Sequence, residues 1–325
     1  MMNMVVTTVV VAILMAKTTR LDNFLMQNTL IVVVGPTGIG KTNLAITLAQ
    51  HFNTQIISAD SRQVYKEITI GTAAPTINEL AQAKHHLVGS HSITEYYSAW
   101  EFEQDVLKLT SELFPNHNPL IMVGGAMMYV DAVCKGIDDM PSIDQQLRDD
   151  VWAHYEEVGL EGMRLQLKQL DPVFYEQVDL KNAKRVVHAV EICLMTGQPY
   201  SSLRTNLVKE RPFRIIKIGL DVPRPELYNR INLRVDKMME NGLIDEVKGL
   251  QHLKHLNSLN TVGYKEVFIF LNGECTLEEA IELIKRNTRR YAKKQLTWFR
   301  KDTSTRWFLP TQTVEIIDYL STVLG

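Results

Sequence analysis

The sequence predicts an α/β fold in which helices flank a parallel β-sheet. Four short, mostly apolar runs, at 30–34, 55–58, 120–123 and 215–220, have the length and composition of buried strands. Segments with helical periodicity separate these runs, and parallel strands require crossover connections of that kind. The first run ends in a glycine-rich loop that leads directly into an amphipathic helix. These observations favour a sheet whose strands all point the same way.

The glycine-rich loop has the composition of a phosphate-binding site. Residues 35–42 read GPTGIGKT and match the pattern G-x-x-x-x-G-K-[ST]. Glycines in such a loop let the backbone N–H groups point inward, towards the positive end of the helix that we expect to begin at about Lys41. Lys41 would reach terminal phosphate oxygens, and the Thr42 hydroxyl would ligate Mg²⁺. The sequence therefore predicts a P-loop NTPase-like sheet.

A crowded polar turn follows the second predicted strand. Residues 58–65 read SADSRQVY, in which a carboxylate, a hydroxyl, a guanidinium and an amide stand side by side. A nucleotide hydrolase normally ends a second strand in an acidic residue that holds the metal-bound water. The run at 120–123 instead leads into Gly124 and Gly125. The polar cluster around Asp60 therefore indicates contact with a substrate.

Several further motifs stand in a specific order along the chain. They are GPTGIGKT, SADSRQVY, VGGAMMY at 123–129, RINLRVDKMMENGLIDEV with Arg230 and Arg234, Val262-Gly263-Tyr264, and KKQLTWFR at 293–300. In this combination the chain resembles the tRNA dimethylallyltransferases, also called isopentenyl-tRNA transferases, from about residue 30 to 301. The phosphate loop alone is common to many enzymes, whereas the combination is specific.

The resemblance implies an activity. It implies transfer of a dimethylallyl group from dimethylallyl diphosphate to the N6 amine of adenosine 37, in tRNAs that read codons beginning with U. The implied partner is the anticodon stem-loop of tRNA, the implied cofactor is Mg²⁺, and we expect a cytoplasmic, monomeric enzyme. Two rival functions stay open: a small-molecule kinase that uses ATP in the same loop, and an adenylate isopentenyltransferase that acts on free nucleotides.

The resemblance also assigns roles to residues. Asp60 is implied as the general base for the adenine amine, and Lys41 and Arg234 as the groups that stabilise the departing diphosphate. The alternative for Arg234 is a surface arginine paired with Asp236 or Glu240, and for Asp60 it is a cap on the next helix. The implied diphosphate-binding residues are Gly35, Pro36, Thr37, Gly38, Ile39, Gly40, Lys41 and Thr42, and Thr42 also holds the metal. The implied tRNA-binding residues are Asp60, Ser61, Arg62, Gln63, Ala126, Arg148, Lys184, Arg185, His188, Gly263, Tyr264 and Lys265.

Two of these positions depart from the family pattern. Ala126 stands where the family has threonine or serine, so that a hydroxyl credited with orienting the amine is missing. His188 stands where an arginine is usual. We expect Ala126→Thr to raise the transfer rate if that hydroxyl matters, and to lower it if the surroundings have been repacked around alanine.

The chain is expected to contain three parts. Residues 29–140 and 201–325 form the catalytic core, 141–200 form an inserted helical subdomain that binds tRNA, and 1–28 form an N-terminal extension without stable structure. The apolar run at 5–16 is shorter than the ~20 residues needed to span a bilayer, so we expect no membrane anchor; an organellar transit peptide is the alternative. Helix starts are marked by Ser98 with Glu101, Ser142 with Gln145, Thr276 with Glu279, and Asp171 before Pro172.

A basic helix is predicted near the carboxyl end, although the net charge of the chain is only −2. A helical wheel gathers its cations on one side and its apolar residues on the other. The cations are Lys285, Arg286, Arg289, Arg290, Lys293 and Lys294, and the packed side holds Ile281, Ile284, Tyr291, Gln295 and Trp298. Such a ridge suits a phosphate backbone, and a merely solvated face is the alternative. With the helical insertion, the ridge favours tRNA over a free nucleotide.

Overall fold

The computed structural model describes residues 28–138, 140, 143–205 and 207–325. The predicted extension at 1–28 therefore lies outside the described residues, apart from Asn28. The chain divides into two compact units, one that reaches Cys134 and resumes at Arg211, and another from Lys135 to Glu210. The predicted subdomain at 141–200 falls within the residue range of the second unit.

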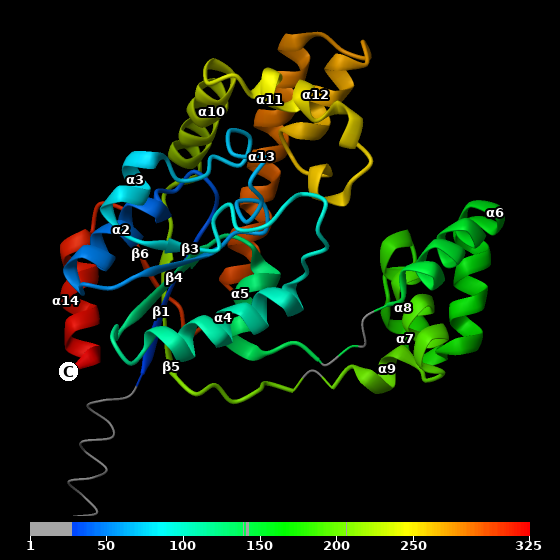
Figure 1. Ribbon diagram of the computed structural model, residues 1–325, viewed down its shortest axis with the longest axis horizontal. Helices are drawn as coiled ribbons and strands as arrows, with labels where there is room; N and C mark the ends of the chain where they lie inside the picture. The colour runs from blue at the N-terminus through cyan, green and yellow to red at the C-terminus, as the bar shows by residue number, and fades with distance from the viewer. Residues whose placement is uncertain (1–27, 139, 141–142, 206) are drawn as a thin grey trace, which may run out of the picture. The chain divides into compact units, whose positions relative to one another are not determined.

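The first unit contains a six-stranded parallel sheet in the order β3-β2-β4-β1-β5-β6 (Figure 1). The strands are β1 Thr29–Val34, β2 Ile56–Ala59, β3 His85–His86, β4 Leu120–Gly124, β5 Arg214–Leu220 and β6 Arg306–Phe308. The four predicted strands and their parallel direction are confirmed. The two edge strands, β3 and β6, were not predicted, because two or three residues are too few to show a periodic pattern.

Helices cover both faces of this sheet (Figure 1). The odd-numbered residues of β1, such as Ile31, pack with α2, α10 and α14, while the even-numbered residues, such as Val32, pack with α4 and α5. This alternation follows from the pleat of a strand that is buried on both sides. The helices of the first unit are α2 Lys41–His51, α3 Ile77–Gln82, α4 Ala99–Leu113, α5 Met127–Lys135, α10 Arg224–Glu240, α11 Leu243–Gly249, α12 Tyr264–Leu271, α13 Leu277–Phe299 and α14 Thr313–Leu324, with short 3₁₀ turns at Gln251–Leu253 and Asn257–Leu259.

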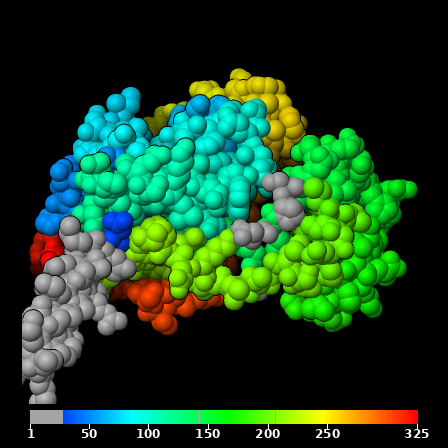
Figure 2. All heavy atoms as spheres, turned by 60° about the horizontal axis from the view of Figure 1, so that its bottom comes forward, coloured from blue at the N-terminus to red at the C-terminus, as the bar shows by residue number. Residues whose placement is uncertain are grey.

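A third hydrophobic cluster of this unit joins the segment after β2 to α10, α11, α12 and α13. Its buried members include Val64, Ile68, Val247 and Ile284. The Ser258 hydroxyl donates to the Ile93 carbonyl at 2.8 Å, which fastens two distant parts of the chain. Figure 2 shows the corresponding cyan and yellow surfaces in contact. The cluster holds α10 and α13 beside the loops that follow β1 and β2.

The second unit is helical and has its own hydrophobic cluster. Its helices are α6 Gln145–Leu170, α7 Pro172–Gln177, α8 Ala183–Thr196 and α9 Tyr200–Leu203. Non-helical torsion angles at Gly159, φ 67° and ψ −175°, kink α6. Ser142 lies outside the described residues, and the cap of α6 is Asp144, which accepts from Leu147 N. The caps predicted at Ser98, Asp171 and Thr276 are confirmed. Within the described part of the chain, no helix combines the length and apolar character needed to cross a bilayer.

Candidate active site

A cavity of about 650 Å³ opens at the carboxyl ends of the central strands. Ligands of open parallel sheets bind at this edge. The cavity wall combines the phosphate loop after β1, the polar turn after β2, the Gly124–Gly125 turn after β4, and parts of α10 and α13. Segments that the sequence places more than two hundred residues apart therefore meet in one place.

The phosphate loop has the conformation that its glycines predict. Gly38 and Gly40 adopt φ values of 79° and 100°, in the left-handed region that favours glycine, and Gly40 precedes the first turn of α2. Thr37, Gly38, Gly40, Lys41 and Thr42 line the cavity. Of the other predicted loop residues, Ile39 is fully buried in the core, whereas Gly35 and Pro36 are not part of the lining.

Lys41 lies at the centre of the charged groups. Its Nζ donates to the Pro36 carbonyl at 2.9 Å. Burial, together with the nearby Arg234 charge, lowers the pKa of Lys41 to about 7, although the Asp60 carboxylate opposes both effects. The three residues predicted to do the chemistry therefore interact electrostatically in one cavity.

Asp60 stands at the first position after β2. Its Oδ1 accepts the backbone N–H of Arg62 at 2.9 Å and that of Gln63 at 3.3 Å. Among the described residues, no donor reaches its Oδ2. One oxygen of the carboxylate therefore caps a turn, where the alternative interpretation expected a helix, while the other is left for a ligand in the cavity that Ser61, Arg62 and Gln63 also line.

Arg234 belongs to the cavity and not to the helix surface. Its Nη2 donates to the Thr72 carbonyl at 3.1 Å, and Gln63 Nε2 donates to the same carbonyl at 3.2 Å. Burial lowers the pKa of Arg234, and the Asp60 charge raises it. Asp236 instead pairs with Lys285 at 2.7 Å, so that the expected alternative for Arg234, a pair with Asp236, is wrong.

Glu246 of α11 organises the turn at 69–71 and was not predicted. Its carboxylate accepts from the backbone N–H groups of Thr69, Ile70 and Gly71 at 2.7–3.0 Å and from the Tyr264 hydroxyl at 2.5 Å. Tyr264 is fully buried, and a Cβ on Gly71 would come within 2.5 Å of its ring. The prediction that Tyr264 contacts tRNA is therefore wrong, because the side chain packs behind the cavity wall. Its neighbours Gly263 and Lys265 do line the cavity.

Gln295 of α13 joins two walls of the cavity and was also missed as a functional residue. Its Oε1 accepts the backbone N–H of Thr37 at 2.9 Å, and its Nε2 donates to the Gly125 carbonyl at 2.8 Å. Tyr291, one turn earlier, keeps 36% of its surface exposed on the cavity wall. The prediction placed Tyr291 on the packed side, and the structure corrects it.

Ala126 points into the core and is not part of the cavity lining. Only 7% of it is exposed, among residues of the cluster beneath α4 and α5. The Ala126 carbonyl accepts from Val130 N at 3.0 Å, so Ala126 occupies the N-cap position of α5. A direct contact between Ala126 and a bound base is therefore not supported by its position.

The six cations on the basic side of α13 are of two kinds: some are exposed to solvent, and others bond to α10. Arg286, Arg290, Lys293 and Lys294 are exposed and have no ion pair within the part of the chain that the structure describes. Lys285 instead pairs with Asp236, and Arg289 Nη1 donates to Asn232 Oδ1 at 2.7 Å. The predicted ridge therefore contains four free cations, and the other two fasten α13 to α10.

Two of the predicted tRNA contacts of the second unit, Arg148 and His188, lie beside one buried carboxylate. Glu191 of α8 lies 3.6 Å from Arg148 Nε and 3.4 Å from His188 Nδ1, and only 3% of it is exposed. Lys184 and Arg185 are exposed on the same helix. The unit thus presents several basic groups near the first half of α8, and their contact with tRNA stays a prediction.

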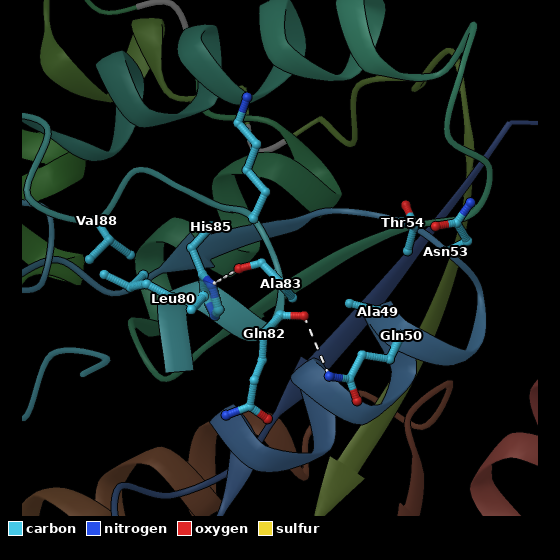
Figure 3. Close-up of a pocket in the computed structure, with 11 residues that line it drawn as sticks. Ala49, Gln50, Asn53, Thr54, Leu80, Gln82, Ala83, His85 and Val88 are labelled. Atoms are coloured by element: carbon cyan, nitrogen blue, oxygen red, sulfur yellow. Dashed lines mark hydrogen bonds between the residues drawn. The ribbon is translucent and has the colours of Figure 1, made fainter. Parts of the chain in front are cut away.

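A second hollow, of about 810 Å³, lies beside α2, α3 and β3 and contains neither the phosphate loop nor Asp60 (Figure 3). In it, Gln50 Nε2 donates to the Gln82 carbonyl at 3.4 Å, and the His85 ring Nδ1 lies 2.8 Å from the Ala83 carbonyl. Thr54 Oγ1 and His85 Nε2 are buried without a hydrogen-bond partner among the described residues. His85 also borders the main cavity.

Comparisons with known proteins agree with this geometry. The model of the IPP transferase family matches residues 63–302. A tRNA dimethylallyltransferase of Bacteroides thetaiotaomicron is 56% identical over 292 residues, which are 90% of this chain and 95% of that protein. Another, of Parabacteroides distasonis, is 55% identical over 295 residues, 91% of this chain and 99% of that protein.

Solved structures lead to the same family. The tRNA isopentenylpyrophosphate transferase of Bacillus halodurans superposes with a TM-score of 0.67 at 36% identity, over 92% of this chain and 97% of that one. A eukaryotic dimethylallyltransferase that acts on tRNA gives a TM-score of 0.77 at 26% identity, over 91% of this chain and 80% of that one.

Proposed function

The chain belongs to the tRNA dimethylallyltransferase family, and we propose that it transfers the dimethylallyl group of dimethylallyl diphosphate to the N6 amine of adenosine 37 in tRNA. The observation that carries this proposal is the meeting of a phosphate loop, Arg234 and Asp60 in one cavity. A diphosphate and a weakly basic amine need groups of these two kinds.

The first requirement is to stabilise the leaving diphosphate. When the allylic C–O bond breaks, negative charge grows on the diphosphate oxygens and a delocalised cation forms on the allyl group. The loop N–H groups, Lys41 and Arg234 surround the place where that charge would develop. Because burial holds the pKa of Lys41 at about 7, a bound diphosphate would favour its charged form and raise that pKa.

The second requirement is to remove a proton from the adenine amine. The lone pair of this amine is delocalised into the ring, so attack on the allyl cation leaves a strongly acidic nitrogen. No donor among the described residues bonds Asp60 Oδ2, whereas Oδ1 is fixed by Arg62 N and Gln63 N. The carboxylate can therefore accept the proton as the new C–N bond forms. The base must leave its stack to reach the cavity, as in other enzymes that act on a base.

The cavity also fits a Mg²⁺ ion that would be held mainly by the phosphate oxygens of dimethylallyl diphosphate. Mg²⁺ commonly takes one or two protein oxygens together with substrate phosphates and water. Thr42 lines the cavity in the first turn of α2, and no group of the described chain bonds its hydroxyl. Thr42 would hold the ion, which would supply positive charge next to the diphosphate. No group of three or more His, Cys, Asp or Glu suited to a metal occurs among the described residues, so the donor oxygens would complete the coordination.

The tRNA would contact both units of the chain. The four free cations of α13 supply the charge that a phosphate backbone requires, and Arg148, Lys184, Arg185 and His188 provide basic groups in the helical unit. We propose that the enzyme acts as a monomer. A tRNA substrate also supports the expectation of a cytoplasmic location.

The proposal is tested by asking where the prenyl group goes. Purified protein is incubated with dimethylallyl diphosphate and Mg²⁺, together with either tRNA or AMP, and the nucleosides are then analysed by mass spectrometry. We expect dimethylallyladenosine from tRNA and unmodified AMP. Modification of AMP alone would instead support the adenylate isopentenyltransferase, and ATP-dependent phosphorylation without prenylation would support a kinase.

A further inference from the structure

We propose that Gln295 is a positioning residue for the prenyl donor, dimethylallyl diphosphate. It holds the phosphate loop and the turn after β4 at a fixed separation. The inference rests on the proposed function, which assigns this loop to the diphosphate. Gln295 lies on α13, the helix that carries the exposed cations, and only 2% of its surface is exposed.

The contacts of Gln295 explain why an amide is needed. Thr37 N requires an acceptor and the Gly125 carbonyl requires a donor, and the two atoms of one amide satisfy both at 2.9 and 2.8 Å. These partners lie 258 and 170 residues away in the sequence. Without Gln295, a backbone donor and a backbone acceptor inside the protein would lose their hydrogen bonds.

The glycine at 125 fits the same arrangement. A Cβ there would lie 2.3 Å from Gln295 Nε2 and 3.5 Å from Lys41 Nζ. Any larger residue would therefore push the amide away from the turn. Gly125 therefore lies close to both the Gln295 amide and the Lys41 ammonium group.

The phosphate loop is the part of the site that most needs such support. Gly38 and Gly40 adopt left-handed conformations, and glycines lose more conformational freedom on ordering than any other residue. A hydrogen bond at Thr37 restricts the loop before the donor arrives, so that less ordering remains to be done on binding. Gln295 acts through Thr37 and Gly125 and takes no part in the chemistry itself.

The test compares the two substrates in the full-length enzyme. Gln295→Met keeps the length of the side chain and removes both hydrogen bonds, and Gly125→Ala displaces the amide from the opposite side. Ile316→Val is the control. Ile316 is fully buried on α14 and is not among the residues that line the active-site cavity. Deletion of one methylene from the core gives a comparable loss of stability without changing the site. Inorganic diphosphate with Mg²⁺ is the probe for direct binding.

We expect Gln295→Met and Gly125→Ala to raise the Kd of diphosphate and the KM of the donor about tenfold, with the KM of tRNA within about twofold of wild type. The control should change none of the three. The proposal is overturned if diphosphate binding matches that of the control, or if both KM values rise equally, as general loosening of the fold would cause. A wild-type protein that binds diphosphate but prenylates no tRNA would contradict the proposed function, and the diphosphate titration would still decide the role of Gln295.

Discussion

Replacing Asp60 by asparagine separates the two roles that its carboxylate combines. Oδ1 fixes the turn through Arg62 N at 2.9 Å and Gln63 N at 3.3 Å, whereas Oδ2 is left for the proposed proton transfer. Asparagine keeps an oxygen for the turn but cannot serve as a base. We expect Asp60→Asn to fold normally and to lose about 10² to 10⁴ in transfer rate, which corresponds to about 3–5 kcal/mol in the barrier.

Asp60→Ala removes both roles and so provides the comparison. Two hydrogen bonds to a charged acceptor are lost, and we expect the free energy of unfolding to fall by about 1–3 kcal/mol. The rate should fall as far as in Asp60→Asn. Rates come from single-turnover transfer at saturating substrates, stability from urea unfolding, and tRNA affinity from filter binding, which should be nearly unchanged in both variants. If Asp60→Asn keeps more than half of the wild-type rate, Asp60 only caps the turn and the base assignment fails.

Three further predictions concern other parts of the site. Changing Arg290 and Lys294 to Glu should weaken tRNA binding and lower its logarithmic salt slope by about one for each lost phosphate contact. The affinity for diphosphate should fall by up to about tenfold per pH unit above pH 7, because Lys41 with its pKa near 7 loses its charge there, while Lys41→Arg should keep only the pH dependence that comes from the ligand. Ala126→Thr should raise the free energy of unfolding by about 1 kcal/mol by capping α5, and should change the single-turnover rate by less than about twofold.

Each of these predictions has its own control. Lys108→Glu reverses an exposed charge on α4 instead of on α13. An equal salt slope in this control and in the α13 variant would mean that the ridge on α13 is only solvated. Ionisation of diphosphate affects the wild-type protein and Lys41→Arg equally. If the pH profiles of these two proteins are parallel, Lys41 is not the titrating group. If Ala126→Thr reacts several-fold faster than wild type, the added hydroxyl helps to orient the adenine amine. That result would contradict the conclusion drawn from the buried position of Ala126.

The sign of the Lys41 effect on stability can also be derived. Its folded pKa, about 7, lies below the ordinary lysine value of 10.5, so between these values the unfolded chain binds the proton more often than the folded chain does. The free energy of unfolding should therefore rise with pH across this interval. Lys41→Met should lose this contribution, which pH-dependent urea unfolding of the two proteins would detect.

The strand, loop and helix that form the phosphate site could be predicted because their signals are local. A buried apolar run, three glycines and an amphipathic segment each act within a few residues, and β1, the loop and α2 follow within one or two residues of the predicted bounds. The edge strand β3 carried no such signal, because its two residues are held by pairing with β2.

The side chains that organise the cavity could not be predicted in the same way. Gln295 and Glu246 bond backbone groups that are 170 or more residues away, and no local pattern reveals such a partner. Gln295 was placed correctly on the packed side of its helix, but that pattern gave no indication of a polar role. A motif also fixes the position of a residue along the chain and not its burial, which is why Tyr264 was taken for a tRNA contact.

The most direct test of prenyl transfer to adenosine 37 uses two matched RNA hairpins. One hairpin is the anticodon stem-loop with adenosine at position 37, and the other carries a purine without the 6-amino group at that position. Each is incubated with the enzyme, dimethylallyl diphosphate and Mg²⁺, and the intact RNA is then weighed by mass spectrometry. We predict that the first hairpin gains one dimethylallyl group and that the second gains none. Equal gain by both hairpins, or gain by neither, would contradict transfer to the adenine N6 amine.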